Sequence, residues 1–299
     1  MGEGGEQMRF AVSTALYADR TLDKALQSAA QVGYEGVEIM CREPHLPPTA
    51  SRGRVEQLAI LTEQLNLKVC CLGTESGNYG DAMLQECRFQ LETLRVYLEL
   101  AGLLKCDLVR HGPGGPPEWR ASTSNWQQAA DWMRRAAEMA RSYGVRLGME
   151  MAFATLIESP EAGRRMLQMV SRKEVGLILS PADAYVARLE LGPHRLSPIK
   201  DSIFHVHVRD VGPGEKSSER GAFMAGERCY EHRLLGEGEV DFRMIAEFLR
   251  TIEYAGWVVA DYTGPAARDV AAQHALQAMK TLFGPQESQA LSLIHISEP

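Results

Sequence analysis

The segment Phe204-His-Val-His-Val-Arg-Asp210 alternates apolar and polar side chains, which is typical of a short strand with a polar end. Since successive side chains of a strand point to opposite faces, His205, His207 and Arg209 share one face. Two imidazoles and a guanidinium on one face indicate a site that binds a metal ion or an anion. A half-exposed strand with a polar outer face is the alternative.

Seven further apolar runs alternate with longer segments of helical periodicity. The eight predicted strands are 9–14, 36–40, 68–72, 107–111, 145–150, 175–179, 205–210 and 256–261. Between two of them, Ser124 and Gln127 predict a capping box at the start of a helix. Eight strand–helix units without a break in composition predict a single (β/α)8 TIM barrel over residues 8–284. A doubly wound open sheet is the competing fold, but no G-x-G-x-x-G follows the first strand.

The segments outside these units carry their own expectations. We expect residues 1–7 to form a flexible N-terminus. We expect residues 285–299 to form a disordered tail, whose last ten or so residues resemble translated sequencing adapter. The segment 212–236 is long for a loop between a strand and a helix. Loops of that length are often lids or disordered.

The composition limits the classes of partner. The chain has 299 residues, 45% of them hydrophobic and 24% charged, and a formal net charge of −7, which disfavours a nucleic-acid groove. No apolar run reaches the roughly 18 residues that span a membrane, and the N-terminus does not resemble a signal peptide. The six cysteines form no C-x-x-C pair, so we expect a reducing cytoplasm.

Polar side chains end several of the predicted strands, and in a parallel barrel those ends face one cavity. The candidates are Glu38, Glu75, His111, Glu150, Asp183, His207 and Asp261. A carboxylate such as Glu150 at the end of an apolar strand is costly unless it is paired or bound to a metal. His207 with two carboxylates suits Mn²⁺, Mg²⁺, Co²⁺ or Zn²⁺. The alternatives are an ion pair with an arginine for Glu150 and a helix N-cap for Asp261.

The other buried polar candidates have weaker signals. His111 borders a Gly-Pro-Gly-Gly loop that would let a ligand approach the backbone, although satisfied histidines at strand ends are common. His205 lies one pleat deeper than His207, so we expect a supporting or core position. Glu38 is expected to pair with an arginine inside the barrel.

Four stretches carry a family resemblance: Gly33-Tyr-Glu-Gly-Val-Glu-Ile39, Gly144-Val-Arg-Leu-Gly-Met-Glu150, His207-Val-Arg-Asp210, and Gly236-Glu-Gly-Glu-Val-Asp-Phe242 through Tyr254-Ala-Gly-Trp257. They resemble the xylose isomerase-like TIM barrels, a superfamily of sugar phosphate isomerases and epimerases. Inosose dehydratases, hydroxypyruvate isomerases and ketose 3-epimerases are among its members. The resemblance runs from about residue 8 to residue 284.

The resemblance implies a divalent metal held by a Glu after strand five, an Asp after strand six, a His after strand seven and a Glu after strand eight. By position these are Glu150, Ser180, His207 and Asp261, so Ser180 replaces an acidic ligand. A serine hydroxyl is a poor ligand for such a cation, unless Asp183 turns inward to supply the missing carboxylate. The expected metal ligands are therefore Glu150, Asp183, His207 and Asp261.

The resemblance implies a metal-dependent isomerase or epimerase of a small sugar, sugar phosphate or inosose, with proton transfer through an enediolate. Glu150 and Asp261 would pass the proton. The residues expected to bind the carbohydrate are His111, Trp119, Arg209 and Glu75. The rivals are a dehydratase of the inosose or 3-dehydroshikimate type and a non-catalytic sugar-binding barrel with a degenerate metal site. The expected partner is a small carbohydrate, without nucleic acid or membrane, and a homo-oligomer stays open.

Overall fold

The computed structural model describes residues 7–215 and 221–285, so the predictions for residues 1–6 and 286–299 lie outside the described residues. Eight parallel strands close into a barrel in the order β1-β11-β7-β6-β5-β4-β3-β2. They are β1 (Arg9–Ser13), β2 (Gly36–Met40), β3 (Lys68–Gly73), β4 (Leu108–Arg110), β5 (Arg146–Glu150), β6 (Val175–Leu179), β7 (Ile203–Val208) and β11 (Trp257–Ala260). Each coincides with a predicted strand to within about two residues, and the prediction of a single (β/α)8 barrel is confirmed.

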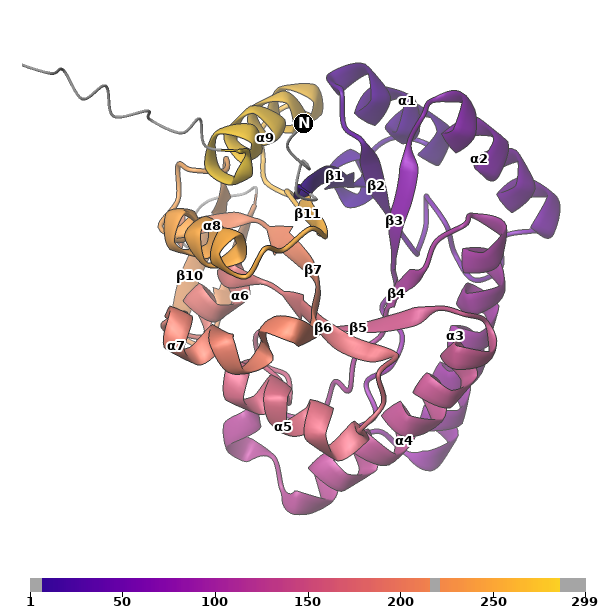
Figure 1. The fold of residues 1–299 in the computed structure, drawn as a ribbon, viewed down its shortest axis with the longest axis vertical. Coiled ribbons are helices and arrows are strands. Elements are labelled where there is room, and N and C mark those ends of the chain that lie inside the picture. Colours follow the sequence, from indigo (N-terminus) through magenta and orange to yellow (C-terminus); the bar gives the residue numbers. More distant parts are fainter. Residues whose placement is uncertain (1–6, 216–220, 286–299) are drawn as a thin grey trace, which may run out of the picture.

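Helices surround the barrel as an outer ring (Figure 1). They are α1 (Leu22–Val32), α2 (Arg52–Gln64), α3 (Leu84–Leu103), α4 (Thr123–Ser142), α5 (Pro160–Val170), α6 (Pro181–Val186), α7 (Pro193–Leu196), α8 (Phe242–Thr251) and α9 (Arg268–Phe283), with short 3-10 turns η1 (Thr14–Tyr17), η2 (Glu118–Arg120) and η3 (Ser197–Ser202). No helix of the described chain has the length and apolar character needed to cross a membrane.

Local sequence explains where individual helices begin. Ser159 caps α5, its hydroxyl accepting from the backbone N of Ala162 at 3.0 Å, and Pro160 takes the first helical position, where its missing N–H costs nothing. For α4 the prediction is wrong by half a turn. Ser122, not Ser124, is the N-cap and pairs reciprocally with Asn125.

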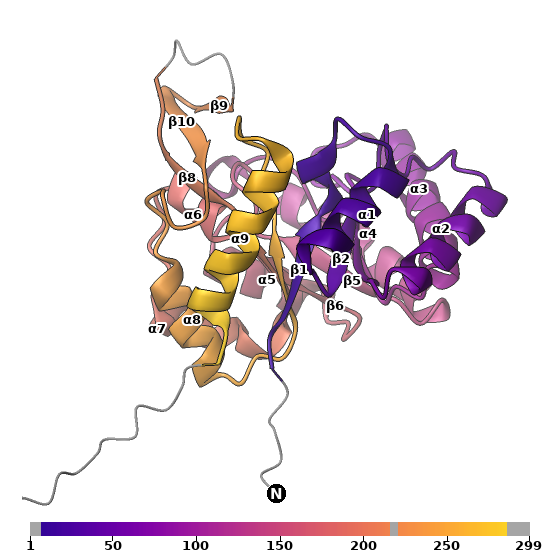
Figure 2. The ribbon, with the colours of Figure 1, turned by 90° about the horizontal axis from the view of Figure 1, so that it is seen from above.

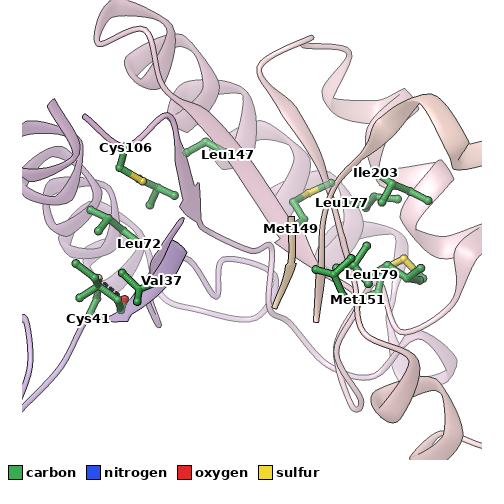
Figure 3. Packing of buried hydrophobic residues seen from close by; sticks show 14 of the residues in the cluster. Val37, Cys41, Leu72, Cys106, Leu147, Met149, Met151, Leu177, Leu179 and Ile203 are labelled. Carbon is green, nitrogen blue, oxygen red and sulfur yellow. Dashed lines mark hydrogen bonds between the residues drawn. The ribbon is translucent and has the colours of Figure 1, made fainter. Parts of the chain in front are cut away.

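The main core lies between the strands and the surrounding helices. In β5 and β6, Met149 pairs in register with Leu177, and both are fully buried with Leu147 and Leu179 on the helix-facing side. Figure 3 shows these side chains gathered on neighbouring strands. Because side chains alternate along a strand, Glu150 must point into the barrel when Met149 points out. The apolar layer thereby fixes which polar side chains face the mouth.

The segment expected as a long loop contains a small antiparallel sheet, in the order β8-β10-β9. Its strands are β8 (Asp210–Pro213), β9 (Ala222–Ala225) and β10 (Arg228–Arg233). Figure 2 shows it projecting beyond the barrel strands, beside α9. Phe223 stacks on Tyr230 with ring centroids 5.9 Å apart, and Tyr230 meets Tyr185 of α6 edge-on at the same centroid distance. This aromatic packing gives the inserted sheet an apolar anchor of its own.

Asp210 fastens the base of the inserted sheet. Its Oδ2 accepts from the backbone N of Gly236 at 2.8 Å and of Gly238 at 3.0 Å, and its Oδ1 accepts from that of Val211 at 2.9 Å. A Cβ on Gly238 would lie 2.1 Å from Asp210 Oδ1, so no larger residue fits there without a shift. The Gly-x-Gly stretch at 236–238 therefore joins the end of the inserted segment to Asp210 at its start.

Candidate active site

The floor of the barrel mouth is a buried carboxylate between two imidazoles. Glu38 Oε2 accepts from His205 Nε2 at 3.1 Å and from His207 Nε2 at 2.9 Å, and both histidines are almost wholly buried. Burial disfavours the charged form, but His207 and then His205 hold the pKa of Glu38 well below its ordinary value. Glu38 thus pairs with histidines rather than with the arginine expected from the sequence.

Glu150 lies directly above this floor, at the end of β5. Its Oε1 accepts from His207 Nδ1 at 2.7 Å, and its Oε2 accepts from Arg110 Nη1 at 2.9 Å. Burial opposes ionisation, yet Arg110 and then His207 bring the pKa of Glu150 far below its usual value. Burial would lower the pKa of His207, but the carboxylates of Glu38 and Glu150 raise it well above its ordinary value. Glu150 is consequently ionised and His207 is an imidazolium.

A second group of charges surrounds Arg209, just after β7. Its Nη2 donates to Asp183 Oδ2 at 2.6 Å, and its Nη1 lies 3.5 Å from Asp261 Oδ2. Ser180 donates its hydroxyl to the same Asp183 oxygen at 2.5 Å, while Asp183 Oδ1 accepts from the backbone N of Phe153 at 3.0 Å. Asp183 therefore does turn toward the barrel, but its oxygens are engaged by Arg209, Ser180 and Phe153.

A cavity of about 250 Å³ opens between the ends of β3, β4 and β5. Its lining consists of Thr74, Glu75, Ser76, Asn78, Arg110, Gly112, Pro113, Gly114, Glu150, Ala152 and Thr155. Arg110 and Glu150 are its ionised residues nearest to the floor. A larger hollow of about 500 Å³ lies against the inserted sheet at Tyr185, Arg228 and Tyr230, away from these groups.

The structure places His111 in the wall rather than at the opening. Its side chain is fully buried, with Nδ1 2.8 Å from Ser76 Oγ and Nε2 2.9 Å from Tyr79 OH. Burial lowers its pKa to about 3. Both ring nitrogens are used by the protein, which favours a supporting role for His111 over direct contact with a carbohydrate.

Trp119 and Glu75 lie farther out. Trp119, in η2, is 77% exposed and is not among the residues that line the cavity. Glu75 does line it, but its carboxylate pairs with Arg42 and its side chain is 63% exposed. Of the four expected substrate contacts, Arg209 alone lies within the buried charge network.

Two mouth residues were not predicted. Arg110 ends β4 two residues after Leu108, so the two side chains share the inward face while Val109 packs in the main core, and the strand pattern contained this signal. His232 comes from β10, with Nε2 3.1 Å from Thr263 Oγ1 and a buried Nδ1 that has no partner among the described residues. Burial, and then Arg209, lower the pKa of His232 to about 4. Nothing in its surrounding sequence indicated that it would reach this side of the barrel.

The donor set can be compared with the metal site that the resemblance implies. Glu150 gives one oxygen to His207 and the other to Arg110, Ser180 donates to Asp183, and Arg209 lies against Asp261. An ion at these positions would compete with two guanidinium groups that never lose their charge. The residues present do not fit the four-ligand set, and we assign no chemical step to a metal.

A different trio comes close to ligand geometry. In the part of the chain that the structure describes, Glu38, His205 and His207 form a possible three-residue metal group, with ligand atoms within 4.8 Å of one another. All three side chains are buried, and His205 Nδ1 has no hydrogen-bond partner there. Metal-bound histidines almost always donate their second nitrogen to an acceptor, so the hydrogen-bonded arrangement explains this trio better.

Similar known proteins include a dehydratase, a zinc-bound protein and an epimerase. The inosose dehydratase of Glaesserella parasuis is 22% identical over 268 residues, which cover 82% of this chain and 84% of that protein. The structure of the IolI protein with a bound zinc atom is similar with a TM-score of 0.78 and 17% identity, covering 92% of this chain and 98% of the other. The structure of D-allulose 3-epimerase from Methylomonas sp. is similar with a TM-score of 0.73 and 19% identity, and the match covers 92% of this chain and 98% of the other.

These structural likenesses show the fold. The family itself is shown by a family model, described as a xylose isomerase-like TIM barrel, that matches residues 26–282. Those residues include all strands of the barrel except β1. The chain belongs to the xylose isomerase-like TIM barrel family.

Proposed function

We propose that the chain is an isomerase or epimerase of a small sugar, sugar phosphate or inosose, acting by proton transfer through an enediolate. The observation that carries this proposal is Glu150, an ionised carboxylate on the lining of a 250 Å³ cavity, held between Arg110 and His207. A base beside a guanidinium is what removal of a proton next to a carbonyl requires. The family and its sugar-converting relatives support the same class of reaction.

Through the Arg110–Glu150 ion pair, substrate binding would make Glu150 a stronger base. In the free protein Arg110 keeps Glu150 weakly basic. A substrate carbonyl oxygen that accepts from Arg110 would weaken that ion pair, so the affinity of Glu150 for a proton would rise when the substrate is in place. His207, behind Glu150, holds the carboxylate in position.

Asp261 is the proposed second proton carrier. It follows β11, three strands from β5 around the barrel, with β7 and β6 between them. Arg209 lies against its carboxylate and, with Asp183, forms the opposite part of the mouth. A substrate bound between Glu150 and Asp261 would lose the proton to one carboxylate and receive it from the other.

A dehydratase is the second candidate, and the inosose dehydratase relative favours it. The first step is the same proton removal, but a β-hydroxyl then leaves. His232, whose Nδ1 has no partner among the described residues, would offer a hydrogen bond to the departing group. Product analysis by NMR in D₂O separates the candidates, since elimination gives an alkene signal and isomerisation gives deuterium at carbon.

Two variants of the base test the proposal. Glu150→Gln is expected to lower kcat at least about 100-fold, because the amide cannot take a proton. Glu150→Asp keeps the charge that Arg110 and His207 need, and should lower kcat with the fold intact by circular dichroism. Glu138→Gln, which breaks an exposed ion pair with Arg172, is the matched control and should leave kcat unchanged. Turnover of Glu150→Gln within twofold of wild type would contradict the assignment.

A further inference from the structure

Two guanidinium groups lie at the barrel mouth at the level where the resemblance implies a cation. Arg110 enters from β4 and donates to Glu150, while Arg209 enters after β7 and pairs with Asp183 and Asp261. Their side chains are 24% and 23% exposed, so each ion pair is largely desolvated. Every carboxylate among the expected metal ligands thus already faces a fixed positive charge.

The positive charges of these arginines cannot be lost when a metal binds, as the charge of a ligand histidine can. A histidine releases its proton when a metal binds, but an arginine stays charged under all conditions in which the protein is folded. A divalent ion on Glu150 would have to break the Arg110 contact and leave that guanidinium buried without its partner. Ser180 adds no negative charge to offset this, because its hydroxyl donates to Asp183.

The guanidinium groups also have capacity for a ligand. Arg110 donates Nε to the Thr74 carbonyl at 3.0 Å and one Nη1 hydrogen to Glu150. Further N–H hydrogens of this guanidinium are left over, and Arg110 lines the cavity. Arg209 Nε is buried and has no partner among the described residues. A buried donor without an acceptor costs free energy, and an acceptor atom of a bound ligand would remove that cost.

We propose that this mouth binds no divalent metal and that Arg110 takes the place of the ion, holding the substrate oxygen that becomes the enediolate. The C–H proton passes to Glu150, its electron pair forms the carbon–carbon double bond, and the carbonyl electrons move onto the oxygen held by Arg110. In an epimerisation the reverse movement re-forms the same carbonyl and delivers a proton to the other face of the same carbon. In an isomerisation the neighbouring hydroxyl passes its proton to the oxygen held by Arg110, its own oxygen becomes the new carbonyl, and the proton from Glu150 is delivered to the former carbonyl carbon. Neither route needs an oxidant. The chemical step rests on the proposed function, whereas the absence of metal does not.

The first test measures metal on the full-length chain. Protein purified without chelator is incubated with Zn²⁺ or Mn²⁺, desalted and analysed by inductively coupled plasma mass spectrometry. We expect well below one ion per chain and no shift of the thermal unfolding midpoint by either metal. About one ion per chain would overturn the proposal, as would activity that EDTA removes and metal restores.

A second test asks whether these residues are the cause. The double variant Ser180→Asp with Arg110→Met restores an acidic ligand and frees Glu150, so it should gain about one Zn²⁺ per chain. Arg172→Met, which removes a partly exposed arginine outside the mouth, is the control and should stay metal-free. A folded double variant that takes up no more metal than wild type would overturn the proposal.

The role of Arg110 in the reaction has its own readout. Arg110→Met should lower kcat about 10²- to 10³-fold with a smaller effect on KM, since an oxyanion contact strengthens in the transition state. Unchanged kcat would overturn this role. If wild type turns over no polyhydroxy carbonyl compound, the proposed function fails, while the metal measurements still decide whether arginine has replaced the ion.

Discussion

Equally buried histidines differ in this barrel by the groups around them. His207 donates to two carboxylates and is held as an imidazolium, whereas His111 is held neutral between Ser76 and Tyr79. The two residues look alike in the sequence, since each stands near the end of an apolar strand. Their opposite charge states follow from what surrounds them: carboxylates for His207, and hydroxyl groups for His111.

The neutral state of His111 predicts a pH dependence of stability. Its pKa of about 3 in the fold lies below the 6.5 of a free histidine, so between these values the unfolded chain binds the extra proton. The free energy of unfolding should therefore fall as the pH falls through this range, with His111 contributing about 2 kcal/mol of loss between pH 7 and pH 5. Urea denaturation at the two pH values measures it.

The control for this effect is an exposed histidine. His194→Asn, on the surface of α7, should keep the full pH dependence of wild type, whereas His111→Asn should be less sensitive to pH by about the stated amount. Equal pH sensitivity of the two variants would show that His111 is not the buried neutral group described.

At this scale the sequence indicated part of the candidate site. Glu150, His207 and Asp261 could be found because each is a polar residue ending an apolar run. The Glu38–His205 contact was missed, since it depends on how the strands are arranged around the barrel. Arg110 was missed although its place in β4 already indicated an inward side chain. Ser180 was identified as a departure, but its hydrogen bond to Asp183 required the turn at the start of α6.

Among the elements, the inserted sheet is the part that changes the mouth. The barrel strands were predictable because each is a compact apolar run, but β8 to β10 mix polar and aromatic side chains, and their pairing is set by contacts with one another and with α6. Loop length alone could not distinguish a sheet from an irregular lid. His232 was missed for the same reason, since its position depends on that sheet.

The hydrogen bonds of Asp210 at the base of the inserted sheet predict that one added methyl group at Gly238 lowers stability. In Gly238→Ala the new Cβ would lie 2.1 Å from Asp210 Oδ1 and 2.6 Å from the Val211 carbonyl, so the hydrogen bonds of Asp210 must shift. We expect a loss of about 2 kcal/mol in unfolding free energy and faster proteolysis within the inserted sheet.

Gly212→Ala, in β8 of the same sheet, is the matched control. Its Cβ would meet only the Arg233 side chain, at 3.7 Å, which is ordinary contact. Urea denaturation of the two variants compares them directly. If they lose the same stability, the close approach of Asp210 to Gly238 is not what holds the sheet.

Over the whole molecule, the sequence predicted the barrel and its family because eight repeats of one unit leave few alternatives. Function is less constrained by this architecture, since catalytic groups come from the ends of different strands. In this chain Arg110, Ser180, Arg209 and Asp261 alter the charge pattern of the mouth without altering the barrel. Under the proposed function, these side chains determine how the charge that develops on the substrate is held.

The proposed mouth has arginine, rather than a metal ion, facing Glu150. Crystals of the full-length chain grown with Zn²⁺ would test it by anomalous scattering at the zinc absorption edge. We expect no anomalous peak between Glu150 and His207, with Arg110 in contact with the Glu150 carboxylate. A peak there with Arg110 displaced would contradict it.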